Sequence, residues 1–298
     1  TSNTHRKKKK MSSQAILYLT NATQQVNITL RSIIFALGLT SNILNIIVFL
    51  SLKTFRESSC AFYLTAMSFV NIGQMFFGLL SRILSVAWGV DWTITYLPYC
   101  KLRYYFFQVF AITSYTCMYL ATIDQYLATC ARTQLQRLSN IKLARVIFAF
   151  MFLIWILHGI PLIILYNQVL SVSANQTVCR ITNPSFQRYY QYGFLLTLLG
   201  IIPVFITVVV GTLAYRNVKQ LLYRTVPLVR RETDKQLTIM VLVQNVYNLF
   251  FIIPYVVGFL LSLNLSVDAD PLYTAQINLT SAITSALYYM TFSVSNSC

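Results

Sequence analysis

The sequence predicts an all-α membrane protein, a seven-transmembrane helix bundle with its N-terminus outside. Hydrophobic residues make up 56% of the 298 residues and charged residues only 10%, and the mean hydropathy is +0.61. A soluble domain carries roughly 25% charged residues. Seven windows are continuously apolar, without the alternation of barrel strands, and each can cross a hydrocarbon core of about 30 Å, which takes roughly 20 helical residues. They lie near residues 32–52, 60–82, 102–123, 143–166, 190–215, 237–263 and 273–298.

Residues 1–30, ahead of the first window, are expected to form an extracellular tail. Acceptor sites for N-glycosylation fall in this tail or in loops on the same side, at Asn21, Asn27, Asn175 and Asn264. The opposite loops hold twelve arginines and lysines, against five in the outer loops and crossing ends that follow the first window, which agrees with the positive-inside rule. The basic run at 6–10 conflicts with this orientation. Because the chain starts with Thr1 and Met11 follows that run, we expect residues 1–10 to be absent from the mature protein.

The net charge of the chain has the same explanation. A formal charge of +16 would suggest a nucleic-acid partner in a soluble protein. Here most basic residues lie in short loops between the apolar windows. Membrane topology therefore accounts for the charge, and no nucleic-acid partner is expected.

Two cysteines lie on the outer side. Cys100 comes just before the third window, and Cys179 lies in the loop between the fourth and fifth windows. Both face an oxidising compartment, where a disulfide is allowed. The other cysteines lie in the membrane or at its inner face and are interpreted as packing thiols: Cys60, Cys117, Cys130 and Cys298.

Prolines interrupt the fourth, fifth and sixth windows at Pro161, Pro203 and Pro254. A proline inside a helix removes one backbone hydrogen bond and kinks the helix, which membranes tolerate when neighbouring groups compensate. Membrane helices often contain proline, so the joint placement of the three is more informative than any one. The longest inner loop, about 216–236, is basic and continues as a helical pattern into the sixth window. This pattern allows the sixth helix to extend beyond the membrane.

Together these features resemble the rhodopsin-like (class A) G-protein-coupled receptors from about Arg31 to the last residue. The segment Asp124-Gln125-Tyr126 at the inner end of the third window resembles the family's Asp-Arg-Tyr, and Asn42 matches the first-helix asparagine. Further matches are the fourth-helix tryptophan, the outer disulfide, two helix prolines and an Asn-Ser-Cys segment, at Trp155, Cys100 with Cys179, Pro203, Pro254 and 296–298. The chain stops before the family's Asn-Pro-x-x-Tyr motif. The seventh helix is therefore expected to be truncated at its inner end, and the receptor domain, 31–298, to be C-terminally incomplete.

The resemblance implies a glycosylated, multi-pass receptor of the plasma membrane. Such a receptor binds an extracellular ligand and transmits a conformational change to a heterotrimeric G protein, without enzymatic activity, cofactor or metal. The chain is similar to divergent invertebrate orphan and FMRFamide-type peptide receptors. A neuropeptide is accordingly the leading prediction for the ligand, and a lipid is the next.

Several residues that carry activation in the family are replaced here. Gln125 stands in place of the arginine, so it cannot form a charged pair with Asp124 or with Asp234 at the base of the sixth helix, although it can donate hydrogen bonds. This predicts a weaker inactive-state latch and raised basal signalling, or poor coupling if the arginine is indispensable. Asn71 replaces the second-helix aspartate, which makes sodium regulation doubtful. Asn71 can instead hydrogen-bond Asn42 and Ser297. In the sixth helix, Asn248 and Ile252 replace the aromatic switch residues.

The family's ligand cavity lies between the outer halves of the third, fifth, sixth and seventh helices. Matched positions predict an apolar and aromatic lining of Phe107, Gln108, Ala111, Leu195, Leu199, Tyr255, Phe259, Met290 and Val294. Phe107 replaces the aspartate of amine receptors, so a biogenic amine is disfavoured. Val294 replaces the retinal-binding lysine of opsins, so covalent photochemistry is excluded. Arg82 either faces the cavity and binds a ligand carboxylate or carbonyl, or pairs with Asp91.

Three alternatives to a signalling receptor fit the sequence less well. A transporter usually shows inverted repeats and intramembrane ionisable residues, whereas these crossings are almost free of acids and show no internal symmetry. An enzyme is disfavoured because His158, apart from His5 the chain's only histidine, is flanked by apolar residues and has no nucleophile partner. It is interpreted as a packing residue that bonds a backbone carbonyl. A receptor-shaped protein that does not signal remains the alternative within the same fold.

Overall fold

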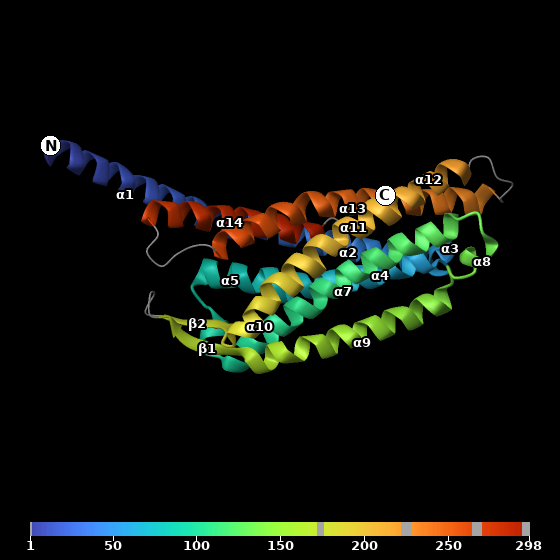
Figure 1. Cartoon of the computed structure of the whole chain (residues 1–298), viewed down its shortest axis with the longest axis horizontal. Coiled ribbons are helices and arrows are strands. Elements are labelled where there is room, and N and C mark those ends of the chain that lie inside the picture. The colour runs from blue at the N-terminus through green and yellow to red at the C-terminus, as the bar shows by residue number, and fades with distance from the viewer. Residues whose placement is uncertain (1, 172–175, 222–227, 264–269, 294–298) are drawn as a thin grey trace.

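The computed structural model of the chain describes residues 2–171, 176–221, 228–263 and 270–293. Within them, seven helical segments lie along one long axis (Figure 1), which confirms the predicted all-α bundle. The first consists of α1 (Ser2–Gln25), a π-helical turn (Val26–Leu30) and α2 (Arg31–Ser51). The second consists of α4 (Ser59–Gln74), a π-helical turn (Met75–Leu80) and α5 (Ser81–Trp88). The third and fourth are single helices, α7 (Leu97–Thr129) and α9 (Ile141–Leu165).

The fifth segment is the most irregular. It begins with α10 (Pro184–Arg188) and a π-helical stretch (Tyr189–Ile201), and continues through α11 (Ile202–Ile206), a second π-helical turn (Thr207–Gly211) and α12 (Thr212–Leu221). Pro203 lies at the start of α11, directly after the long π-helical stretch, where it lacks the N–H that an α-helix needs. The interruption that the sequence predicted at this proline is therefore present.

The sixth and seventh segments are α13 (Leu228–Leu263) and α14 (Pro271–Ser293). The sixth begins nine residues before its apolar window at 237, as the helical pattern of the inner loop predicted. Pro161 and Pro254 lie inside α9 and α13. Six of the seven segments are long and apolar enough to span a membrane, and α14, which is rich in threonine and serine, is the exception among the described residues.

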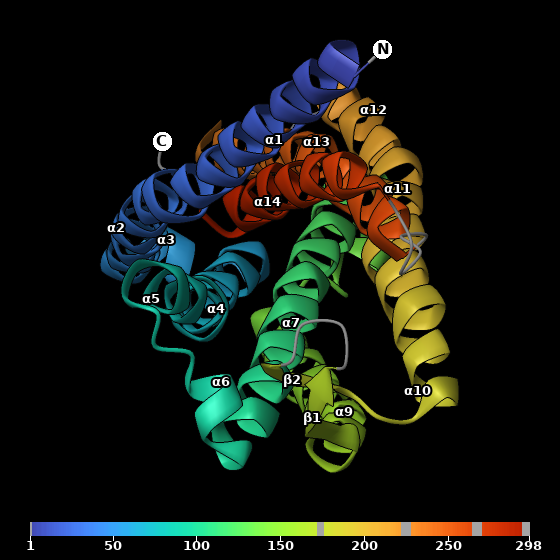
Figure 2. The same ribbon diagram turned by 90° about the vertical axis from the view of Figure 1, so that its left-hand side faces the viewer.

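Short elements close the two ends of the bundle. The end with the hairpin β1 (Tyr166–Ser171) and β2 (Gln176–Ile181) also holds α6 (Trp92–Thr95), which contacts β2, and we call it the outer end (Figure 2). The opposite, inner end holds α3 (Lys53–Arg56) and α8 (Thr133–Gln136). A disulfide between Cys100 and Cys179 fastens the start of α7 to β2, with 6.0 Å between the two Cα atoms, which confirms the predicted pair. Cys60, Cys117 and Cys130 are free thiols, and Cys298 lies outside the described residues.

The centre of the bundle is α7, which packs against α4, α9, α12 and α13 (Figure 2). Its inward positions carry small and polar side chains, and the outer surfaces of other segments carry large apolar ones such as Phe150 and Phe250. This distribution suits a bundle surrounded by lipid. The predicted tail is helical: α1 continues without a break into the first transmembrane segment and packs along α14. Asn21 is exposed on α1, Asn27 lies in the following π-helical turn, and Asn175 and Asn264 lie outside the described residues.

Candidate functional site

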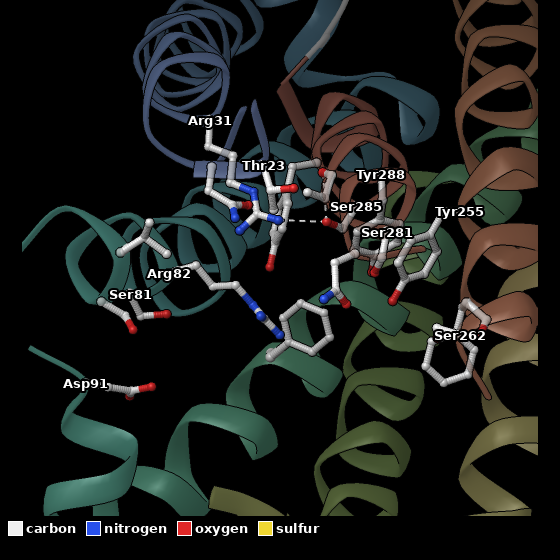
Figure 3. Close-up of a pocket in the computed structure, with 18 of the residues that line it drawn as sticks. Thr23, Arg31, Ser81, Arg82, Asp91, Tyr255, Ser262, Ser281, Ser285 and Tyr288 are labelled. Carbon is white, nitrogen blue, oxygen red and sulfur yellow. Dashed lines mark hydrogen bonds between the residues drawn. The ribbon is translucent and has the colours of Figure 1, made fainter. Parts of the chain in front are cut away.

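A cavity of about 540 Å³ opens at the outer end of the bundle (Figure 3). It lies between α2, α5, α7, α13 and α14, and the end of α1 forms part of its rim. The fifth segment contributes no residue to it. Its lining consists of Thr23, Asn27, Arg31, Ser81, Arg82, Ser85, Val86, Asp91, Arg103, Phe107, Tyr255, Phe259, Ser262, Asn278, Ser281, Ala282, Ser285, Tyr288 and Tyr289.

Three arginines from three different helices line this cavity. Arg31 on α2 is only 4% exposed, and its Nη2 donates a hydrogen bond of 2.7 Å to Ser285 Oγ on α14. Arg103 on α7 is also buried, and its Nε donates to Ser81 Oγ at 2.7 Å and to the Phe77 carbonyl at 3.3 Å. These acceptors are neutral oxygens. They orient the two guanidinium groups without compensating their charge.

Arg82 on α5 differs from the other two arginines because it is exposed to the cavity. Its guanidinium extends toward the middle of the cavity and away from Asp91 (Figure 3). The Asp91 carboxylate instead caps α6, accepting hydrogen bonds of 2.9 Å from the Thr93 N–H and 2.5 Å from the Thr93 hydroxyl. Between the two sequence-based alternatives for Arg82, the geometry therefore favours the cavity over a contact ion pair with Asp91.

The wall opposite Arg82 is aromatic. Tyr255 of α13 stacks on Tyr288 of α14 with 4.3 Å between ring centroids, and Tyr288 meets Tyr289 edge to face at 5.5 Å. Phe107 of α7 reaches the same cluster, with its ring centroid 6.3 Å from that of Tyr288. The Tyr288 hydroxyl is buried without a hydrogen-bond partner. The cavity thus has a cationic side and an aromatic side.

Four of the ten residues predicted for the ligand site line this cavity: Arg82, Phe107, Tyr255 and Phe259. Val294 lies outside the described residues, and the other five lie in the packed interior. Ala111, Leu195 and Leu199 are buried core residues, and Met290 packs against the core. Gln108 is buried and its Nε2 lies 2.9 Å from His158 Nδ1, while His158 Nε2 lies 2.6 Å from the Tyr189 hydroxyl. His158 thus bonds two side chains, and not the backbone carbonyl that was expected.

Sequence reasoning missed Arg31, Arg103, Tyr288 and Tyr289. The two arginines could have been predicted from their positions in the sequence. Each lies at the outer end of an apolar window, as Arg82 does, and a charge at that position must face a polar cavity or snorkel to the membrane surface. The two tyrosines carried no such signal, because tyrosine is common in membrane-interface belts.

The inner end of α7 holds the Asp-Gln-Tyr segment. Asp124 is buried, and its Oδ1 accepts a hydrogen bond of 2.7 Å from Ser59 Oγ at the start of α4. Gln125 is buried too, and its Oε1 accepts a hydrogen bond of 2.7 Å from Thr238 Oγ1 of α13. Tyr126 is half-buried, and Asp234 lies in the first turns of α13 with a side chain outside the described ones. A neutral hydrogen bond therefore joins the third and sixth segments where the family uses charge.

The family is decided by a comparison with known protein families. The model of the rhodopsin family of seven-transmembrane receptors matches residues 41–298. The chain belongs to this family. No curated protein matches the chain significantly. Family membership makes the protein a non-enzymatic, multi-pass membrane receptor that signals from an extracellular ligand to a G protein.

A polar network lies midway along the receptor, around the substituted Asn71. Asn71 Nδ2 donates to Asn42 Oδ1 at 3.2 Å, and its Oδ1 accepts from Ser114 Oγ at 2.5 Å. Asn42 in turn donates to the Phe292 carbonyl at 2.8 Å, which ties α2 to α14. The predicted contact between Asn71 and Asn42 is confirmed, and the predicted contact with Ser297 lies outside the described residues. The described part of this network contains no carboxylate, so it has no anion for a sodium ion.

The sixth segment of the receptor faces α7 with amides in place of aromatic rings. Asn245 Nδ2 donates to Thr122 Oγ1 at 2.8 Å, and Asn248 lies against the Met118 sulfur. Ile252, which replaces the aromatic switch residue, is buried one turn further out, and Pro254 follows it. Polar contacts therefore link the third and sixth segments over several turns.

Proposed function

We propose that the extracellular ligand of this receptor is a short neuropeptide, one end of which enters the outer cavity. The single observation that carries this proposal is the mixed lining of the cavity. Serines, asparagines and arginines suit peptide carbonyls and charged groups, and the tyrosine cluster suits an apolar or aromatic side chain. A lipid has a long apolar chain, and the polar lining of this cavity is less complementary to such a chain.

The FMRFamide-type peptides that the sequence resemblance suggests are one group of candidates. As their name indicates, these peptides end in a phenylalanine amide that follows an arginine. Inside the cavity, that arginine side chain would be repelled by three arginines of like charge. Peptides with a free carboxyl end avoid this repulsion. Both groups therefore belong in a screen.

The experiment is a screen of amidated peptides, acid peptides and lipids on cells that express the receptor, with G-protein dissociation as the readout. We expect a peptide to give a saturable response that cells without the receptor lack. Two phenylalanines of α13 supply a matched pair of variants: Phe259 lines the cavity, and Phe250 is 71% exposed on the lipid-facing surface.

Phe259→Ala should lower the potency of the active peptide, and Phe250→Ala should leave it unchanged. If only lipids activate the receptor, the peptide proposal is wrong. If the two variants have equal potency, the ligand does not use this cavity.

A further inference from the structure

We propose that the outer cavity recognises a carboxylate, held by Arg82 in a cavity that Arg31 and Arg103 also line. This inference rests on the proposed function only in taking the cavity as the ligand site. It adds the chemical class of the group that enters. The shared chemistry is a carboxylate, which either the C-terminus of a peptide or the head of a fatty acid can supply.

The charge balance of the cavity is the first argument. Among its lining residues, three guanidinium groups face one carboxylate, that of Asp91, which leaves a net charge of +2. The Asp91 carboxylate accepts its two hydrogen bonds from Thr93, both at Oδ1, and Arg82 forms no hydrogen bond or contact ion pair with any described residue. A cation in a membrane protein is costly unless it faces water or an anion, and such residues commonly mark ligand paths. An anionic ligand group supplies the missing partner.

Unused donors at the cavity wall are the second argument. Arg31 is buried, yet its Nε has no hydrogen-bond partner, because the contact with Ser285 uses Nη2. A buried donor without a partner costs roughly 1–3 kcal/mol. Arg82 keeps all of its donors free for the cavity. A carboxylate has two oxygens that accept hydrogen bonds from the planar fork of a guanidinium, so it fits these donors better than a single carbonyl does.

The opposite wall indicates what is attached to the carboxylate. Tyr255 and Tyr288 face the arginines across the cavity (Figure 3), and their stacked rings offer an apolar and aromatic surface. A group with a carboxylate at one end and an aromatic or apolar body next to it contacts both walls at once. A peptide that ends in a free aromatic residue has this composition.

The test uses thermal unfolding of the purified receptor in detergent, with small probes at millimolar concentration and equal ionic strength. N-acetylphenylalanine and its amide form one pair, and hexanoate and hexanamide form the other. We expect the carboxylate probes to raise the unfolding midpoint and their neutral amides to leave it unchanged. If the difference in unfolding midpoint between acid and amide is larger for the aromatic pair, a peptide C-terminus supplies the carboxylate. If it is larger for the aliphatic pair, a lipid supplies it.

Two variants decide whether Arg82 holds the carboxylate. Arg82→Gln should weaken probe affinity about tenfold to a hundredfold, the loss typical of charged hydrogen bonds worth roughly 1.5–3 kcal/mol. Arg188→Gln, an exposed arginine of α10 outside the cavity, should change nothing. Because Arg82 has no described hydrogen-bond partner, its loss should not impair folding.

Two results would overturn the inference: no difference between acid and amide probes, or an unchanged probe affinity in Arg82→Gln. These outcomes are separable from a failure of the peptide proposal. An amidated peptide that activates wild type and Arg82→Gln equally removes the carboxylate inference and leaves the peptide proposal intact. If hexanoate raises the unfolding midpoint but no peptide activates the receptor, the carboxylate inference stands and the peptide proposal is wrong.

Discussion

Gln125 accepts a hydrogen bond of 2.7 Å from Thr238, and this neutral contact joins α7 to α13 at the inner end of the receptor. The neighbouring Asp124 is occupied by Ser59 and not by Gln125. A neutral hydrogen bond contributes a net of roughly 0.5–1.5 kcal/mol, and a charged one about twice as much. This contact between the third and sixth segments is therefore weaker than a charged latch at the same place would be.

Thr238→Val removes the donor of this contact and keeps the shape of the side chain. We expect basal nucleotide exchange on the G protein to rise about two- to tenfold, which corresponds to the loss of one neutral hydrogen bond. The measurement is agonist-free GTPγS binding at matched surface expression. Thr212→Val, at an exposed position of α12, is the control. An unchanged basal rate in Thr238→Val would show that the contact does not hold the inactive state.

Gln125→Arg places a guanidinium directly after the buried Asp124. We expect basal signalling to fall, because a charged pair with Asp124 strengthens the inactive arrangement. Gln125→Lys brings the same charge without the planar fork and should have a smaller effect. Equal basal and evoked signalling in wild type and both variants would remove the idea that Gln125 weakens the latch. A response that appears only in Gln125→Arg would mean that the natural glutamine couples poorly.

Asn71→Asp introduces a carboxylate into the neutral network with Asn42 and Ser114. We expect the wild-type receptor to unfold at the same temperature in sodium chloride and in choline chloride. The variant should unfold at a higher temperature in sodium chloride, because the new carboxylate attracts a monovalent cation in a site of low dielectric constant. Sodium dependence of the wild type would refute the view that Asn71 has removed this regulation.

Gly38→Ala tests the close contact between the first and seventh segments. An added Cβ would lie 2.8 Å from Met75 Cε, 2.9 Å from Ser293 Cβ and 3.1 Å from the backbone Cα of Ser293. Small residues allow membrane helices to approach this closely, and overpacking costs about 1–3 kcal/mol. We expect a lower unfolding midpoint and reduced surface expression. At Gly200 the nearest atoms are 3.5 and 3.8 Å away, so Gly200→Ala should be tolerated; similar losses in both variants would argue against a special contact at Gly38.

Much of the fold could be predicted from the sequence because hydropathy and topology report directly on membrane crossing. The helical windows, the Cys100–Cys179 pair and the contact between Asn42 and Asn71 all follow from local pattern or from family position. The position of the cavity could not be predicted in this way. Hydropathy shows that Arg31, Arg82 and Arg103 lie near the outer surface, but it does not show which helix faces they share. That depends on the rotation of α2, α5 and α7 about their own axes, which packing sets.

Matching residues to family positions also predicted the wrong location for the cavity. Matching helix positions predicted a cavity that includes the fifth segment, and there Leu195 and Leu199 are buried in the core. The tyrosines of α14 fill the space between α7 and α13 and leave the cavity open toward α2 and α5. Side-chain volume and helix rotation, neither of which a single sequence reports, decide this difference.

We expect a ligand that contacts Arg82 in the arginine-lined cavity to drive G-protein activation by this receptor. The most direct measurement is nucleotide exchange on a purified G protein by the receptor in lipid nanodiscs, with the active peptide titrated against wild type, Arg82→Gln and Arg188→Gln. We predict stimulated exchange in wild type and Arg188→Gln at the same peptide concentration, and a shift of at least about tenfold in Arg82→Gln. Exchange that no peptide stimulates would contradict activation by a peptide ligand, and equal potency in all three proteins would contradict a ligand contact with Arg82.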